Sequence, residues 1–203
     1  MTIRNVTDRR AGIFKRTAVS LFRLKQKLPA FEQVLPVFST ILFIVFSWMF
    51  WQFFIQVPSW LFYMDAVKLL IMFAYVVSFS LIECLMLMGF IIVLCVVFPI
   101  GHFKEKFIAQ GTIQVFLISL ITYVIRQKIE LFQKFEIWKL AIIPLAALAI
   151  ILVSTLIFSK VFNRFSLARR FFDKLADRMM IFTYLYLPLG VAGLVIIVIR
   201  NLT

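Results

Sequence analysis

The chain has 203 residues, 64% of them hydrophobic and 15% charged, with a mean hydropathy of +1.04 and a formal net charge of +13. Soluble domains are about half apolar and roughly a quarter charged, whereas the apolar residues here gather in long charge-free runs that fit the roughly 20 residues needed to cross a bilayer. We therefore predict an all-α, polytopic membrane protein. A membrane β-barrel is excluded, because its strands would alternate apolar and polar residues over about 10 positions.

The N-terminal segment, residues 1–33, is basic and precedes the first apolar run. Within it, residues 11–28 form an amphipathic pattern typical of an interfacial helix, in which Lys15, Arg16 and Arg23 would contact anionic lipids. The apolar run that begins at Val34 is too long for the h-region of a cleaved signal peptide. We expect it to remain as the first span.

Five apolar runs, free of charge except for Glu83 in the second, predict five transmembrane helices in a single membrane domain, residues 34–203. The spans are expected at about 34–57, 69–100, 107–125, 140–159 and 179–199. The third is the weakest, because it is short and carries Gln110 and Gln114. A re-entrant third segment would place the C-terminus in the cytoplasm, but it conflicts with the charge distribution.

The charges between the runs predict an orientation. If all five segments cross, one side of the membrane carries 16 of the 22 lysines and arginines. The positive-inside rule then places the N-terminus in the cytoplasm and the C-terminus outside, as in a bacterial inner-membrane protein. All four tryptophans fall toward the outer side, as an interfacial aromatic belt would.

A second basic amphipathic helix is expected at 166–179, lying on the cytoplasmic interface. Arg169, Arg170, Lys174 and Arg178 would contact anionic lipids there. Asp173 and Asp177 share a face of this helix, but two acids beside four cations favour ion pairing over a site for paired metals.

No cofactor is predicted, because the chain has one histidine and its two cysteines, Cys84 and Cys95, lie in one apolar run. Eleven helical positions separate them by roughly 16 Å, beyond disulfide reach. No catalytic site is predicted either, since no base lies beside the hydroxyl groups of the spans. The positive charge follows the flanks of the spans, which indicates lipid headgroups and not nucleic acid as its partner.

Small residues and a proline indicate packing sites. Pro188 lies inside the last span and is expected to kink it, and Gly190 and Gly193 would let another helix approach closely. The run from Leu69 to Ile100 would be about 48 Å long as one helix, which exceeds a hydrocarbon core of roughly 30 Å. We expect this helix either to break near Gly89 or to project past the bilayer.

Glu83 is the one charged residue in that run. An ionisable group at span depth costs about 2.5 kcal/mol or more and normally faces protein or water. A hydrogen bond within the protein, with Ser80 one turn away as one candidate, is the leading interpretation. The alternatives are a proton- or cation-handling role and a polar contact to a partner subunit or ligand.

These features favour a non-catalytic accessory or assembly subunit of a larger membrane complex. One alternative is a small oligomeric channel or a proton- or cation-coupled transporter subunit that uses Glu83. Another is a lipid-handling or membrane-shaping protein that uses its basic helices. Membrane lipids and other membrane subunits, or further copies of this chain, are the expected partners.

Overall fold

The computed structural model describes residues 28–98, 106–127 and 137–202, and within these ranges it contains helices and no strand. The helices are α2 (Phe31–Trp60), α3 (Ala66–Val97), α5 (Phe107–Gln127), α7 (Ile137–Arg164) and α8 (Ser166–Leu202). Each is long and apolar enough to cross a membrane. The predicted all-α, multi-pass architecture is therefore confirmed, and each helix contains most of one predicted span.

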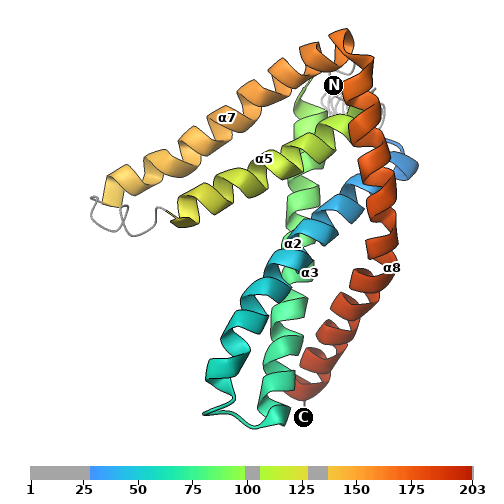
Figure 1. The fold of residues 1–203 in the computed structure, drawn as a ribbon. Helices are drawn as coiled ribbons and strands as arrows, with labels where there is room; N and C mark the ends of the chain where they lie inside the picture. Colours follow the sequence, from blue (N-terminus) through green and yellow to red (C-terminus); the bar gives the residue numbers. More distant parts are fainter. Residues whose placement is uncertain (1–27, 99–105, 128–136, 203) are drawn as a thin grey trace, which may run out of the picture.

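The helices form two parts. Helices α2, α3 and α8 pack side by side as a three-helix bundle, whereas α5 and α7 form a hairpin that diverges from it to one side (Figure 1). The α2–α3 turn and the end of α8 lie at one end of the bundle, and the α7–α8 junction lies at the other. Successive helices thus run in alternating directions, as crossing segments must.

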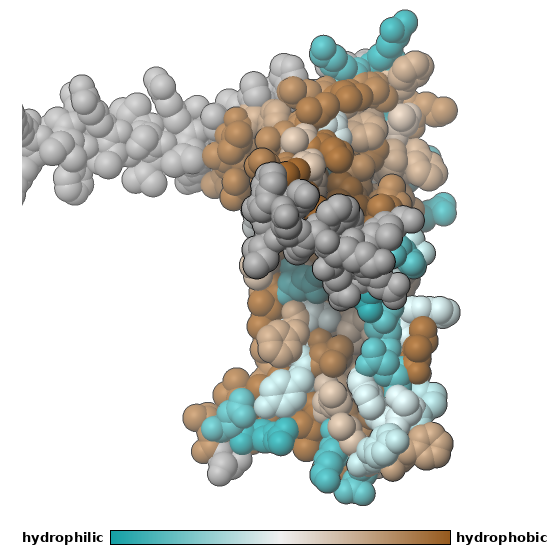
Figure 2. All heavy atoms as spheres, turned by 90° about the vertical axis from the view of Figure 1, so that its left-hand side faces the viewer, coloured by the Kyte–Doolittle hydropathy of each residue, from teal (hydrophilic) through white to brown (hydrophobic). Residues whose placement is uncertain are grey.

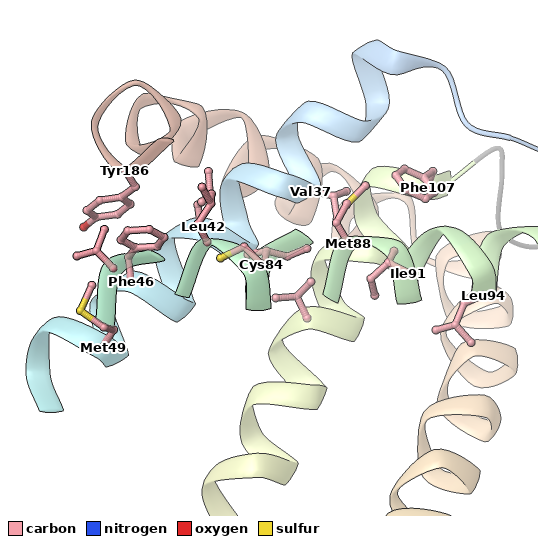
Figure 3. Packing of buried hydrophobic residues seen from close by; sticks show 14 of the residues in the cluster. Val37, Leu42, Phe46, Met49, Cys84, Met88, Ile91, Leu94, Phe107 and Tyr186 are labelled. Carbon is pink, nitrogen blue, oxygen red and sulfur yellow. The ribbon is translucent and has the colours of Figure 1, made fainter. Parts of the chain in front are cut away.

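The core lies where the three bundle helices meet. Phe46 of α2 stacks on Tyr186 of α8 with their ring centroids 5.0 Å apart, and Phe182 stacks on the same tyrosine at 5.7 Å. Figure 3 shows this pair at one end of a cluster that continues along α2 and α3 to Phe107 of α5. Between α2 and α8, the hydroxyls of Ser39 and Thr183 lie 2.6 Å apart and form a buried hydrogen bond. Lipid surrounds an apolar helix face as favourably as a neighbouring helix does, so hydrogen bonds such as this one fix how the two helices are aligned.

Two of the predicted packing glycines lie against α3. A methyl group at Gly193 would lie 2.8 Å from Ser78 Oγ and 3.0 Å from the carbonyl oxygen of Ala74, and one at Gly190 would lie 3.0 Å from a methyl carbon of Leu81. Contacts this short leave no room for a side chain. The two glycines therefore let α8 approach α3 closely.

Helix α3 differs from its expected form in two respects. It passes through Gly89 without a break, and a methyl group at Gly89 would meet nothing within 4 Å. Of the two predicted alternatives, a break near Gly89 is therefore not observed, and projection past the bilayer stays a prediction. The helix also ends at Val97 and not at Ile100. Phe98 is extended, with φ −78° and ψ 152°, because the residue before a proline is driven out of the helical region.

The separate interfacial helix predicted at 166–179 is not observed. Helix α8 is continuous from Ser166 to Leu202, so these residues form the first turns of the last span. At 37 residues it is about 55 Å long. It also continues through Pro188, which lies within it, and it changes direction partway along its length (Figure 1).

Candidate functional site

The hairpin meets the bundle through the first half of α5. A methyl group at Gly111 would lie 3.0 Å from both methyl carbons of Val37, so the absence of a side chain lets α5 rest on α2 there. Phe107 and Val115, one turn to either side, are fully buried. Beyond Val115 the residues of α5 become progressively exposed, because α5 diverges from α2 and α3 (Figure 1). We call the space between them the fork.

The fork contains a cavity of about 620 Å³. Helix α2 supplies one wall, α3 the base, and α5 the other wall. It is mostly apolar, but a carboxylate, a guanidinium and several hydroxyl groups open into it. The lining residues are Phe43, Ile44, Val45, Ser47, Trp48, Met49, Trp51, Ser80, Glu83, Leu87, Ile118, Ser119, Thr122, Tyr123 and Arg126.

Glu83 lies at the base of the fork, as the eighteenth of the 32 residues of α3. Its side chain is exposed, and it has no hydrogen bond or ion pair with any residue that the structure describes. The expectation that it would bond within its own chain is therefore not met. A carboxyl group at mid-helix with no partner needs one from outside the chain.

The side chains that could have bonded Glu83 have other partners. Ser80 donates to the carbonyl oxygen of Val76 at 2.9 Å. Gln52 accepts a hydrogen bond from Arg126, and Gln114 bonds to α7. Tyr123 accepts from Gln127 at 3.2 Å. Ser80 and Gln114 are donors in these bonds, so each would have to give up a bond to donate to Glu83 and would gain little by doing so.

Arg126 occupies the α5 wall and was not predicted to share a site with Glu83. Its Nη2 donates to Gln52 Oε1 at 3.1 Å, and its guanidinium carbon lies 5.3 Å from the ring centroid of Trp48. Tyr123 packs edge-on against Trp48, with ring centroids 6.1 Å apart. These contacts tie the outer part of α5 to α2 across the mouth of the cavity. From the sequence, Arg126 belonged to an interfacial flank, and no spacing rule linked it to Trp48.

A second polar region lies inside the hairpin. Gln114 Nε2 donates to Ser154 Oγ at 3.1 Å and to Thr155 Oγ1 at 2.9 Å, and all three residues are buried. Lys106, which is 6% exposed, donates to the carbonyl oxygen of Ser159 at 3.3 Å. In the sequence Gln110 and Gln114 make the third span look weak, whereas in the structure Gln114 holds α5 against α7. The i, i+4 spacing of Lys106, Gln110 and Gln114 was the signal that could have revealed this face.

The residues expected to contact lipid lie at the end of the molecule that contains the α7–α8 junction. Arg170, Lys174 and Arg178 are exposed, and Arg169 Nε lies 3.7 Å from Asp173 Oδ2 in an i, i+4 ion pair. Lys15, Arg16 and Arg23 lie outside the described residues. Figure 2 shows the apolar surface that dominates the hairpin side of the molecule, with hydrophilic residues gathered at the end that holds the α2–α3 turn and below the projecting hairpin.

Within the described ranges no group of three or more His, Cys, Asp or Glu side chains is arranged to hold a metal ion. Cys84 and Cys95 are both buried, and neither forms a disulfide. In comparisons with known proteins, no family model, no curated sequence and no solved structure matches this chain. The geometry of the fork is therefore the basis for assigning a function.

Proposed function

We propose that the protein is a non-catalytic assembly subunit of a larger membrane complex, and that the fork receives a transmembrane helix of a partner subunit. The observation that carries this proposal is Glu83. Its carboxyl group is at mid-helix, lines the cavity and has no partner among the described residues. A partner helix that presents a basic or amide side chain would satisfy it.

The position of Glu83 favours a protein partner over a lipid. Acyl chains offer no hydrogen-bond donor, and headgroups lie at the membrane surface, about 15 Å from the centre of the bilayer. A side chain on a neighbouring helix reaches mid-span without displacing a headgroup. The largely apolar walls of the cavity, with Leu87, Ile118 and Met49 among them, would pack against the rest of that helix.

The orientation follows from the same charge argument as above. Lys160, Arg164 and the basic first turns of α8 all lie at the α7–α8 end of the molecule. We infer that this end faces the cytoplasm of a bacterial cell, with the C-terminus outside. The exposed cations there would contact anionic headgroups, each contributing about 1 kcal/mol.

Site-specific photocrosslinking in intact membranes tests the proposal. p-Benzoylphenylalanine in place of Leu87, which lines the cavity one turn from Glu83, should form a discrete adduct with another membrane protein. The matched control is Leu85, which is exposed on the same helix but does not line the cavity. An adduct with a second copy of this chain would identify the complex as a homo-oligomer. Adducts with lipid alone, or equal adducts from both positions, would contradict a specific docking site.

A second candidate function is proton or cation coupling through Glu83, as part of a small channel or transporter. The observation that favours it is the set of hydroxyls facing the same cavity, from Ser47, Ser119 and Thr122. Reconstituted protein with a pH-sensitive dye tests it directly. Flux that Glu83→Gln abolishes would support this function, and no flux above that of empty vesicles would rule it out.

A further inference from the structure

Gln110 has no hydrogen-bond partner although it is 1% exposed. Neither its side-chain oxygen nor its side-chain nitrogen bonds to any other residue that the structure describes. A primary amide offers two donors and an acceptor. Buried polar groups are almost always satisfied by protein or by ordered water, so this side chain needs a hydrogen-bond partner that the described residues do not supply.

The neighbours of Gln110 along α5 define its surroundings. Lys106 and Gln114 lie one turn to either side of it, and i, i+4 positions share a helix face. Both neighbours donate to α7: Lys106 to the carbonyl oxygen of Ser159 and Gln114 to the hydroxyls of Ser154 and Thr155. Gln110 thus stands in the middle of a buried polar seam between α5 and α7, with satisfied groups at both ends.

We infer that the seam binds water at Gln110, between Lys106 and Gln114. A buried water typically makes about three hydrogen bonds to polar groups that the protein leaves unpaired. Gln114 is eight positions after Lys106 in the chain, so the polar seam is roughly 12 Å long. The site is distinct from the fork, whose cavity is lined by other residues of α5.

Thr112 also has a buried hydroxyl without a partner in the described ranges. It is two positions from Gln110 and therefore on a different face of α5. We do not include it in the seam.

Lipid cannot replace water at Gln110, because acyl chains carry no hydrogen-bonding groups.

X-ray radiolytic footprinting tests the inference, because hydroxyl radicals formed from bound water oxidise side chains beside it. Phe107 lies one turn from Gln110 on α5, and Phe46 is a matched control in the dry aromatic core; both are nearly inaccessible, at 1% and 0% exposed. In purified wild-type protein we expect Phe107 to be oxidised several-fold faster than Phe46. In Gln110→Leu the rate at Phe107 should fall to that of Phe46, whereas Gln56→Leu, a change of an exposed glutamine in α2, should leave it unchanged.

Equal, slow oxidation of Phe107 and Phe46 in the wild type would show that the seam is dry and would overturn the inference. So would a rate at Phe107 that Gln110→Leu does not lower. The wild-type comparison stands without the variant, so a Gln110→Leu protein that failed to fold would not remove the test.

Discussion

Glu83 and Arg126 line the same cavity without forming an ion pair. Arg126 instead bonds Gln52 and stacks on Trp48, so the cation is held on the α5 wall while the acid at the base of the fork remains unpaired. The carboxylate at the base of the fork and the guanidinium on its α5 wall can each bind a different group of an incoming helix. This arrangement distinguishes the fork from the packed, satisfied bundle beside it.

Removing Trp48 should loosen the α5 wall of the fork. Trp48→Leu removes the stacking on Arg126, a contribution of about 0.5–1 kcal/mol at an exposed site. The amides of 118–127 should then exchange hydrogen about two- to five-fold faster in detergent. Trp51→Leu is the control, because Trp51 is exposed and lines the cavity without contacting Arg126. Equal effects of the two changes would show that the stacking does not hold α5.

The close approach of α8 to α3 should fail when Gly193 gains a side chain. Gly193→Ala places a methyl group 2.8 Å from Ser78 Oγ and 3.0 Å from a backbone carbonyl, and relieving such overlap costs about 1–3 kcal/mol. Gly89→Ala is the matched control. The added methyl group meets nothing within 4 Å. Alanine has a higher helix propensity than glycine, so the stability of the protein should stay the same or rise by up to about 1 kcal/mol. Thermal unfolding in detergent measures both, and similar losses for the two would refute the packing role of Gly193.

Gln114 should couple energetically to α7. Gln114→Leu and Ser154→Ala each remove part of the buried contact, and a double-mutant cycle isolates the interaction energy between the two side chains. In a membrane protein such interaction energies average about 0.6 kcal/mol and reach at most about 1.7 kcal/mol. Denaturant unfolding of the four proteins provides the measurement. A coupling of zero would mean that the hairpin is held by apolar packing alone.

Much of the fold could be predicted from the sequence, because each helix contains an apolar run long enough to cross a bilayer. The continuity of α8 could not, because the change from basic to apolar residues near Arg178 resembles the end of an interfacial helix although no helix breaker lies there. The fork could not be predicted either. It depends on the point where Gly111 rests on Val37, and periodicity within α5 does not reveal which helix will contact that glycine.

The candidate site was predicted in part. Glu83 stood out as a lone charge in an apolar run, but its partners depend on the angle between α5 and the bundle. That angle brings Arg126 to the cavity and turns Gln114 toward α7. From the sequence, a bond within the chain is therefore the leading interpretation for Glu83, but the residues that the structure describes provide none.

The proposed orientation can be tested by cysteine labelling in right-side-out vesicles. A membrane-impermeant maleimide should fail to label Arg170→Cys and should label Leu202→Cys. The native Cys84 and Cys95 are buried and serve as an unlabelled background. Labelling at position 170 from outside would reverse the topology.

The most direct test of the central claim is Glu83→Leu, measured for both stability and assembly. Because Glu83 has no hydrogen-bond or ion-pair partner among the residues that the structure describes, the purified Leu variant should be as stable as the wild type or more stable. Assembly should nevertheless be weaker. The loss of a hydrogen bond to the partner costs about 1–3 kcal/mol, which lowers the association constant about five- to 150-fold. The Leu87 photocrosslink should decrease accordingly, whereas Glu83→Gln, which keeps a hydrogen-bonding group, should retain most of it. A Leu variant that unfolds more easily but still forms the full crosslink would contradict the account, because Glu83 would then be bonded within the chain and not to a partner.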